Sequence, residues 1–269
     1  MHAVSPTVGA PALTLSVEIV PLLTDNYGYL LTDVATGAVA VVDPADAGPV
    51  LDRIRACGSR LDWILLTHHH GDHVAGTAEL VAATGAKVAG AAADAHRLPP
   101  LDRPLVEGDR LELGCSTTRV LATPGHTTGH IAYLFEASLD LFCADTLFVM
   151  GCGRLIEGDA PKMWASLEKL AALPPATKVW CGHEYTLANA RFALSVDPDN
   201  EALHVRARLV ERLRAEGRPT VPSTIGEERA TNPFLRARDP AIRRRLGLEA
   251  ATDAEVFAAL RRAKDAFRG

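Results

Sequence analysis

Short runs in which hydrophobic and polar positions alternate fill the first two thirds of the chain, and this period of two predicts strands. Predicted strands cover 13–20, 27–32, 38–42, 61–66, 87–89, 110–113, 117–121, 131–135, 139–143 and 178–181. Apolar residues that recur every three to four positions predict helices at 50–57, 74–84 and 161–173. The strands fall into two successive series with helices between them. We therefore expect an α/β fold in which two sheets pack together with helices outside.

The pattern changes after about residue 185. Strand-like alternation stops, charged helical segments are predicted at 201–216 and 253–267, and the stretch 218–239 between them is expected to be rich in loops. We therefore divide the chain into a larger α/β domain, residues 1–185, and a smaller, mainly helical domain, residues 186–269.

Composition narrows the class of protein. The chain has 269 residues, 48% hydrophobic and 23% charged, with a net charge of −5. These values are ordinary for a globular protein, and they give no basic footprint for nucleic acid. No apolar run reaches the 18 or more residues of a membrane span. We expect neither a nucleic-acid nor a membrane partner. The sequence leaves the oligomeric state open, with a monomer as the simplest expectation.

Cysteine usage and the N-terminus bear on the compartment. Five cysteines form an odd set without a CxxC pair, which favours a reducing environment over a disulfide framework. Residues 1–15 lack a basic region and contain Pro6 and Pro11, so they do not resemble a secretion signal. We expect a cytoplasmic protein whose first dozen residues are frayed.

Histidines are concentrated directly after the predicted strand 61–66. Four of the ten histidines lie within the stretch His68-His69-His70-Gly71-Asp72-His73. Neutral imidazole and carboxylate are good ligands for zinc and other divalent first-row metals. The alternation of His68 and His70 aims both rings the same way, which leaves Asp72 and His73 for a second centre. A polar surface loop is the plainer alternative.

Three more residues with ligand chemistry follow other predicted strands. His126 follows 117–121, Asp145 follows 139–143, and His183 follows 178–181. A lone histidine is more often structural, but α/β sheets place ligands beyond the carboxyl ends of their strands, so together these positions predict one shared site. Asp43, at another strand end, is either an orienting partner of a ligand histidine or a plain turn aspartate before proline.

The spacing HxHxDH followed by separate His, Asp and His resembles the metallo-β-lactamase-fold hydrolases. The resemblance implies an αββα sandwich over the first domain and two divalent metal ions, zinc by preference with iron or manganese as alternatives. It assigns His68, His70 and His126 to one ion, Asp72, His73 and His183 to the other, and Asp145 to both. His69 is expected to point away. A hydroxide bridging the ions would be the nucleophile, with Asp72 and Asp145 as the catalytic carboxylates.

Further segments make nearly the whole chain similar to the glyoxalase II (hydroxyacylglutathione hydrolase) family. They are Thr24-Asp25-Asn26-Tyr27, Asp145-Thr146-Leu147-Phe148, Gly151-Cys152-Gly153-Arg154, Gly182-His183-Glu184-Tyr185-Thr186, Asn232-Pro233-Phe234 and Arg261-Arg262-Ala263-Lys264-Asp265. The implied reaction is hydrolysis of the thioester S-D-lactoylglutathione to D-lactate and glutathione, a step of methylglyoxal detoxification. The helical domain would then bind substrate. A thiolate leaves with little acid assistance, which suits a site without a recognisable general acid.

The resemblance assigns glutathione contacts to Arg154, Tyr185, Arg261 and Lys264. A solvated helix face is the plain alternative for Arg261 and Lys264, which lie one helical turn apart. The chain has Arg154 and Ile156 where animal-type members carry Lys and Tyr, so Ile156 removes one hydrogen bond to glutathione. Cys152 and Cys181 are expected to be small buried residues.

Three other functions remain open at this point. A lactonase, a phosphodiesterase or another thioesterase would use the same fold, usually without the C-terminal Arg/Lys pair. A mononuclear-iron persulfide dioxygenase would not need a complete second ligand set. A binding module without metals would not need seven residues of ligand type.

Overall fold

The computed structural model describes residues 15–269. The expected fraying of the first dozen residues, the absence of a secretion signal and the start of the first strand at residue 13 all lie outside the described residues. Among residues 15–269, no helix is both long and apolar enough to span a bilayer.

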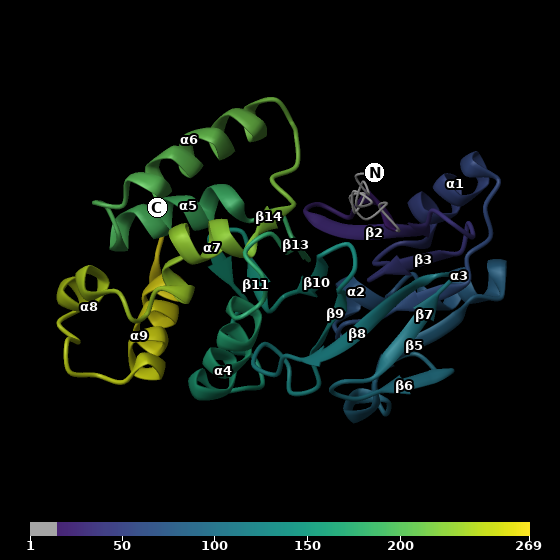
Figure 1. Cartoon of the computed structure of the whole chain (residues 1–269), viewed down its shortest axis with the longest axis horizontal. Coiled ribbons are helices and arrows are strands. Elements are labelled where there is room, and N and C mark those ends of the chain that lie inside the picture. The colour runs from purple at the N-terminus through teal and green to yellow at the C-terminus, as the bar shows by residue number, and fades with distance from the viewer. Residues whose placement is uncertain (1–14) are drawn as a thin grey trace, which may run out of the picture.

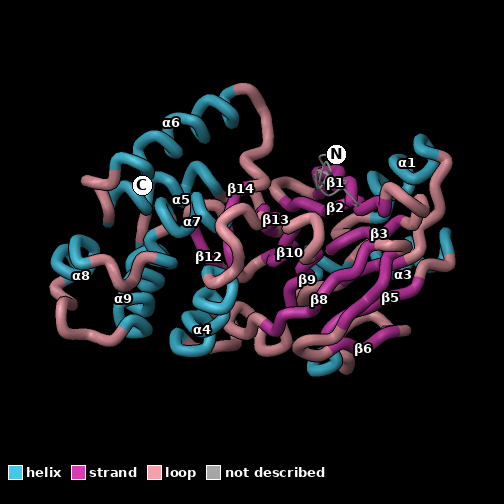
Figure 2. The backbone as a smooth tube through the Cα atoms, viewed as in Figure 1, coloured by secondary structure: helices cyan, strands magenta, loops and turns pink. Residues whose placement is uncertain are grey.

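Two six-stranded sheets form the body of the molecule (Figures 1 and 2). The first has the order β1 (Leu15–Leu22), β2 (Asn26–Asp33), β3 (Val39–Val42), β4 (Trp63–Leu65), β5 (Lys87–Ala91), β6 (Arg103–Leu105). The second has the order β14 (Ser223–Thr224), β13 (Lys178–Cys181), β10 (Asp140–Ala144), β9 (Ile131–Phe135), β8 (Ser116–Ala122), β7 (Arg110–Leu113). A separate hairpin pairs β11 (Leu147–Phe148) with β12 (Gly151–Cys152).

Helices lie outside the sheets and gather toward the C-terminal end of the molecule (Figure 1). They are α1 (Ala47–Cys57), α2 (Gly71–Val74), α3 (Thr77–Thr84), α4 (Ala160–Ala171), α5 (Thr186–Val196), α6 (Glu201–Ala215), α7 (Ile225–Thr231), α8 (Pro240–Leu246) and α9 (Asp253–Ala266), with 3₁₀ turns at Ala92–Asp94 and Pro233–Leu235. The division of the chain into two domains at residue 185 stays a prediction.

Strand β9 shows how the layers are built. Its residues Ile131, Tyr133 and Phe135 belong to the apolar core between the two sheets, and Ala132 and Leu134 belong to the core on the outer face. This alternation is the period of two of a strand buried on both sides. Helices α4 and α9 cover that outer face, and α1 and α3 cover the outer face of the first sheet. The predicted αββα sandwich is confirmed.

Strand direction explains where the functional loops meet. Strands β3 and β4 are parallel, β10 and β13 are parallel, and β8 and β10 each run antiparallel to β9. The carboxyl ends of β8, β10 and β13 therefore lie along one edge of the second sheet, as do those of β3 and β4 in the first. Ligand sites of α/β sheets lie at such edges.

The expected helix 74–84 is in fact two, α2 and α3, because Gly76 interrupts it. Its amide donates to the Pro44 carbonyl at 2.9 Å, and a Cβ there would lie 2.7 Å from that oxygen. The close approach of this backbone to the start of α1 breaks the helical run.

Several short elements were missed, and the stretch 218–239, expected to be rich in loops, also contains β14, α7 and a 3₁₀ turn. Strand β6 contains Pro104, which weakens the strand pattern but is tolerated at the sheet edge. Strand β14 has two residues and pairs with β13, which corrects the expectation that strands stop after residue 185. Helix α7 is too short for periodicity and begins at a capping box between Thr224 and Glu227.

Candidate metal centre

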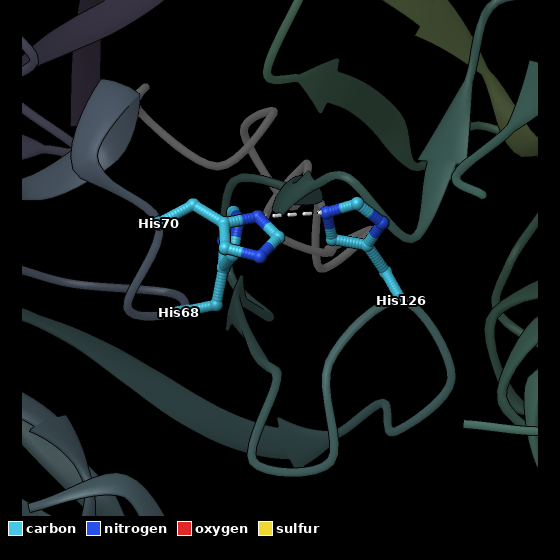
Figure 3. Close-up of side chains that lie close together, drawn as sticks. All are labelled: His68, His70 and His126. Atoms are coloured by element: carbon cyan, nitrogen blue, oxygen red, sulfur yellow. Dashed lines mark hydrogen bonds between the residues drawn. The ribbon is translucent and has the colours of Figure 1, made fainter. Parts of the chain in front are cut away.

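Three histidines from two loops meet at the sheet edge. The Nδ1 atom of His70 lies 3.1 Å from Nε2 of His68 and 3.1 Å from Nε2 of His126 (Figure 3). His68 and His70 follow β4, and His126 follows β8. The structure thus brings together residues that are up to 58 positions apart in the chain.

A second group lies beside the first. The Nε2 atoms of His73 and His183 are 3.3 Å apart, and Asp72 Oδ2 lies 3.7 Å from the first and 3.4 Å from the second. His73 lies on α2, which begins directly after His70, and His183 follows β13. Each group offers three ligand atoms within 4.8 Å of one another.

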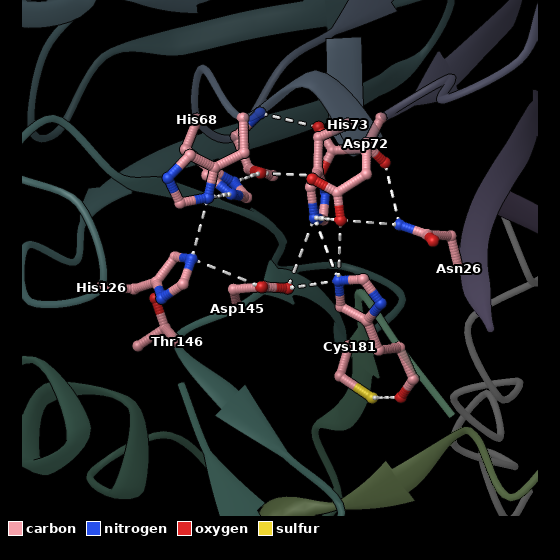
Figure 4. Close-up of polar contacts among 12 residues, drawn as sticks. Asn26, His68, Asp72, His73, His126, Asp145, Thr146 and Cys181 are labelled. Carbon is pink, nitrogen blue, oxygen red and sulfur yellow. Dashed lines mark hydrogen bonds and ion pairs between the residues drawn. The ribbon is translucent and has the colours of Figure 1, made fainter. Parts of the chain in front are cut away.

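Asp145 lies between the two groups (Figure 4). Its Oδ1 is 3.5 Å from Nε2 of His73 and 3.4 Å from Nε2 of His183, and its Oδ2 is 3.4 Å from Nε2 of His126. One carboxylate therefore faces both sets of imidazoles. This is the position expected of a group shared by two cations.

Hydrogen bonds on the far side of each ring decide which nitrogen faces the centre. The Nδ1 atom of each of four rings lies against an acceptor, and the pairs are His68 with Thr67 Oγ1 (3.0 Å), His73 with Asp43 Oδ2 (3.0 Å), His126 with the Arg154 carbonyl (2.9 Å) and His183 with Asp25 Oδ1 (3.0 Å). The Thr67 hydroxyl itself donates to Asp43, so it accepts from His68. With a proton on each of these four Nδ1 atoms, the four Nε2 atoms face the centre, whereas His70 faces it through its Nδ1.

Ring nitrogens whose lone pairs point at one another repel unless a proton or a metal cation lies between them. Imidazole and carboxylate donors at this spacing fit a divalent metal. Asp43 holds the His73 ring and, through Thr67, the His68 ring, so the structure confirms it as an orienting partner. Such partners fix ring orientation and raise ligand basicity.

The electrostatics of the centre favour positive charge. Burial lowers the pKa of His73, but the carboxylates of Asp145 and Asp43 outweigh burial and raise it to about 9. Burial, with the neighbouring His73, holds the pKa of His68 well below its usual range. Burial alone would raise the pKa of Asp145, yet the surrounding histidines keep it low, so this carboxylate is ionised.

The backbone at the strand ends is shaped to the site. Asp43 has φ of 48° and Ala144 has φ of 38°, a left-handed region that non-glycine residues rarely occupy. A Cβ on Gly182 would collide with Asp145 Oδ1, and one on Gly153 with the Asp145 carbonyl. Two close glycines and the strained Ala144 therefore adjoin Asp145, and the strained Asp43 orients the His73 ring, as strain tends to gather at functional sites.

His69 turns away from the centre. Its Nδ1 lies 3.4 Å from Asp94 and its Nε2 lies 3.4 Å from Glu157, within a group in which Arg97 pairs with both carboxylates. The His69 ring therefore points away from both ligand groups, as expected.

A cavity of about 470 Å³ opens over the metal-facing residues. Residues of the predicted site line it together with apolar neighbours, and they are His70, Asp72, His126, Asp145, Phe148, Cys152, Gly153, Arg154, Ile156, His183, Tyr185, Ala188, Asn189, Arg261 and Lys264. The four residues expected to contact substrate thus share one cavity with both ligand groups.

Two of the three cations of α9 are held in place by the protein. Arg261 is 5% exposed and donates to the Cys152 carbonyl at 2.8 Å and to Asp265 at 2.8 Å, so a solvated helix face is wrong for it. Lys264 donates to the Ala188 carbonyl at 2.8 Å. Burial, helped by Arg261, lowers the pKa of Lys264 to about 8.

Tyr185 and Arg154 border the metal-facing residues themselves. The Tyr185 ring stacks on the His183 ring at a centroid distance of 4.7 Å and an interplanar angle of 4°. The side chain of Arg154 is exposed at the cavity while its carbonyl holds the His126 ring. Ile156 is 59% exposed and lines the same cavity. Cys152 and Cys181 are buried, as expected, and burial raises the pKa of their thiols to about 11 and about 12.

Sequence reasoning missed several residues of the site. Asp25 and Asn26 contact the metal-facing residues from the turn between β1 and β2, and only the segment Thr24-Asp25-Asn26-Tyr27 had drawn attention to them. His130 stacks on the His68 ring at 4.7 Å and 21°. A single histidine without a spaced partner carries no signal that could have revealed it.

Comparison with known proteins shows the family of the chain. Residues 25–183 match the model of the metallo-β-lactamase superfamily, and residues 184–267 match that of the hydroxyacylglutathione hydrolase C-terminus. A hydroxyacylglutathione hydrolase of Methylococcus capsulatus is 57% identical over 255 residues, which cover 95% of this chain and 100% of the relative. One of Rhodospirillum rubrum is 54% identical over 254 residues, covering 94% and 99%. The chain belongs to the hydroxyacylglutathione hydrolase family.

Solved structures carry the same fold as this hydroxyacylglutathione hydrolase family member. ETHE1 from Myxococcus xanthus superposes with a TM-score of 0.62 at 26% identity, over 91% of this chain and 96% of that one. The protein TTHA1623, crystallised in a di-iron-bound form, superposes with a TM-score of 0.56 at 29% identity, over 78% and 95%. Both likenesses extend over most of the described sheets.

Proposed function

We propose that the chain hydrolyses S-D-lactoylglutathione to D-lactate and glutathione at a pair of divalent metal ions. The observation that carries this proposal is the single cavity lined by five of the seven residues of ligand type together with Arg154, Tyr185, Arg261 and Lys264. The other two, His68 and His73, belong to the same ligand groups. The names of the relatives, hydroxyacylglutathione hydrolase, support the same reaction. The structure of TTHA1623 in a di-iron-bound form supports a dinuclear centre on this fold.

We assign one ion to His68, His70 and His126, the second to Asp72, His73 and His183, and Asp145 to both. Zinc is our first choice, with iron and manganese as alternatives, since all three accept imidazole and carboxylate ligands. When bound, such ions lower the pKa of water and polarise a carbonyl oxygen. The hydrogen bonds that the rings of His68, His73 and His183 donate to Thr67, Asp43 and Asp25 hold the rings ready for this role.

The remaining side chains bind and position the substrate. Hydrolysis forms a bond from the oxygen of water to the acyl carbon and breaks the C–S bond, and the sulfur of glutathione leaves as a thiolate. A thiol with a pKa near 8.5 leaves readily, so no general acid is needed. Arg261 and Lys264 attract the carboxylates of glutathione, while Arg154 and the Tyr185 hydroxyl lie nearer the metal-facing residues.

An assay of purified protein loaded with zinc tests the proposal. We expect loss of thioester absorbance with S-D-lactoylglutathione and two ions per chain by metal analysis. A single ion at saturation, together with oxygen uptake on glutathione persulfide, would favour a mononuclear-iron dioxygenase instead. The five free cysteines support a reducing, cytoplasmic compartment for this activity.

A further inference from the structure

The turn between β1 and β2 touches the metal-facing residues on one side only. Asp25 Oδ1 accepts a hydrogen bond from Nδ1 of His183 at 3.0 Å. The side-chain amide of Asn26 donates to the main-chain oxygen of Asp72 at 2.9 Å and to its Oδ2 at 3.3 Å (Figure 4). Two consecutive residues therefore hold two of the three residues of one ligand group.

Main-chain hydrogen bonds lock the turn to the strand end that carries His183. The Tyr27 amide donates to the Gly182 carbonyl at 2.8 Å, and the Glu184 amide donates to the Asp25 carbonyl at 2.9 Å. Asn26 and His183 form an isolated antiparallel bridge. Because the turn and the His183 segment are paired in register, the Asp25 carboxylate cannot move independently of the ring that it orients.

The other ligand group is held from elsewhere. The His68 ring rests on Thr67 and the His126 ring on the Arg154 carbonyl. Within residues 15–269, the side-chain hydrogen bonds of Asp25 and Asn26 reach His183 and Asp72. The turn thus supports the Asp72–His73–His183 group without a hydrogen bond to the His68–His70–His126 group.

Burial and geometry fit a positioning role for both residues. Asn26 is 7% exposed, and its amide fixes the rotamer of an Asp72 side chain that is 43% exposed and has few other constraints. Asp25 fixes the proton of His183 on Nδ1, so that Nε2 faces His73 and Asp145. Loss of such partners typically weakens metal binding by about 10- to 100-fold.

We propose that Asp25 and Asn26 are positioning residues that set the affinity of one metal ion, the one assigned to Asp72, His73 and His183, independently of the other. This proposal rests on the dinuclear centre of the proposed function. It predicts that variants of the turn become deficient in one ion while the rest of the centre stays filled.

Zinc titration of the chelator-treated full chain by calorimetry and metal analysis tests the proposal. We expect two ions for the unaltered protein. For Asp25→Ala and Asn26→Ala we expect one binding step within about twofold of the original and the other weakened by about 10- to 100-fold. Asp25→Asn retains an oxygen acceptor for His183 and should recover most of the lost affinity.

Tyr27→Phe is the matched control on the same turn. It removes the hydroxyl that donates to Glu184 at 2.6 Å but leaves the bonds to Asp72 and His183, so both binding steps should stay within about twofold. Circular dichroism melts of the metal-free proteins show whether each variant folds, and an alanine variant that does not fold is replaced by the leucine variant at the same position, Asp25→Leu or Asn26→Leu, which keeps the shape of the side chain without its polar atoms.

A double-variant cycle identifies the affected ion. In a His126→Ala background, Asp25→Ala should weaken the remaining ion, whereas in a His183→Ala background it should have no effect. Equal weakening of both ions, or no weakening of either in Asp25→Ala and Asn26→Ala, would overturn the role of the turn. Fewer than two ions in the unaltered protein would instead overturn the dinuclear function, whatever the variants do.

Discussion

Nε2 of His73 and Nε2 of His183 lie 3.3 Å apart although 110 positions separate the two residues in the chain. Each ring has its other nitrogen against a carboxylate, Asp43 for His73 and Asp25 for His183. Two buried imidazoles that turn their lone pairs toward each other are stable only around a cation or a shared proton. The raised pKa of His73 indicates that a proton lies at this point in the metal-free chain, and a metal ion would take its place.

Replacement of Asp145 by Asn is expected to deplete both metal ions. The variant keeps the shape of the side chain but removes the charge that faces His73, His183 and His126. Metal analysis after dialysis should give well under one ion per chain. His126→Ala is the comparison, because it removes a residue of one group and should leave about one ion. Two ions retained in Asp145→Asn would contradict a shared role for this carboxylate.

Replacement of Lys264 by Ala is expected to raise KM for the glutathione thioester about tenfold and to change kcat by less than about twofold. The lost contact holds a charged part of the substrate that is distant from the thioester, and it stabilises the bound substrate and the transition state equally. A hydrogen bond to a charged group contributes about 1.5–3 kcal/mol to binding. The neighbouring exposed Arg262 offers a control on the same helix, and Arg262→Ala should leave both constants unchanged. An unchanged KM in Lys264→Ala would remove the basis for this subsite.

Arg261→Ala should differ from Lys264→Ala by also lowering the stability of the fold. The guanidinium is buried, donates to the Cys152 carbonyl and lies 5.1 Å from the Phe234 ring centroid. Leaving a buried carbonyl without its donor costs about 1–3 kcal/mol. Thermal melts of the metal-loaded proteins should show a lower midpoint for Arg261→Ala than for Lys264→Ala, and equal midpoints would contradict the structural role.

Much of the fold could be predicted because it depends on local pattern. The strands of both sheets alternate or are apolar throughout, and β9 shows how one strand serves two cores. The seven ligand-type residues were found for the same reason: each lies in a loop or short helix that follows a strand, where α/β folds place their ligands. Elements of two or three residues, such as β6 and β14, are too short to carry a period and depend on a neighbouring strand instead.

Asp43 was a candidate orienting residue from the sequence, but the orienting roles of Asp25 and Asn26 could not be predicted because they exist only in three dimensions. Asp25 precedes His183 by 158 positions, and Asn26 precedes Asp72 by 46. A single aspartate or asparagine in a turn has the same local signature whether or not a ring rests on it. Arg261 was assigned to the substrate by resemblance, with a solvated helix face as the alternative, and its burial against Cys152 likewise exists only in the folded chain.

Gly182→Ala is expected to weaken metal binding without touching any ligand. A methyl group at this position would overlap Asp145 Oδ1 and lie 2.9 Å from Cε1 of His73, so the shared carboxylate must shift. We expect at least a tenfold loss of zinc affinity by calorimetry, with the metal-free protein still folded. Gly71→Ala is the control, because a Cβ there meets no atom within 4 Å, and it should bind zinc normally. Unaltered affinity in Gly182→Ala would mean that Asp145 tolerates displacement.

Glu228 should make the stability of the fold depend on pH near neutrality. The side chain is fully buried on α7, where its Oε2 accepts from the Met150 amide at 2.8 Å and from Asn232 at 2.9 Å. Burial raises its pKa to about 7, from 4.5 for the free group. Between these two values the folded chain binds more protons than the unfolded chain, so the free energy of unfolding falls as pH rises.

Glu228→Gln tests this dependence, because the amide oxygen can still accept both hydrogen bonds while the charge is gone. The shift corresponds to about 3 kcal/mol between pH 4.5 and pH 7. Denaturant unfolding of the metal-free proteins at several pH values should show this loss in the unaltered chain and a flatter profile in Glu228→Gln. Parallel profiles for the two proteins would show that the carboxyl group is already ionised in the fold at low pH.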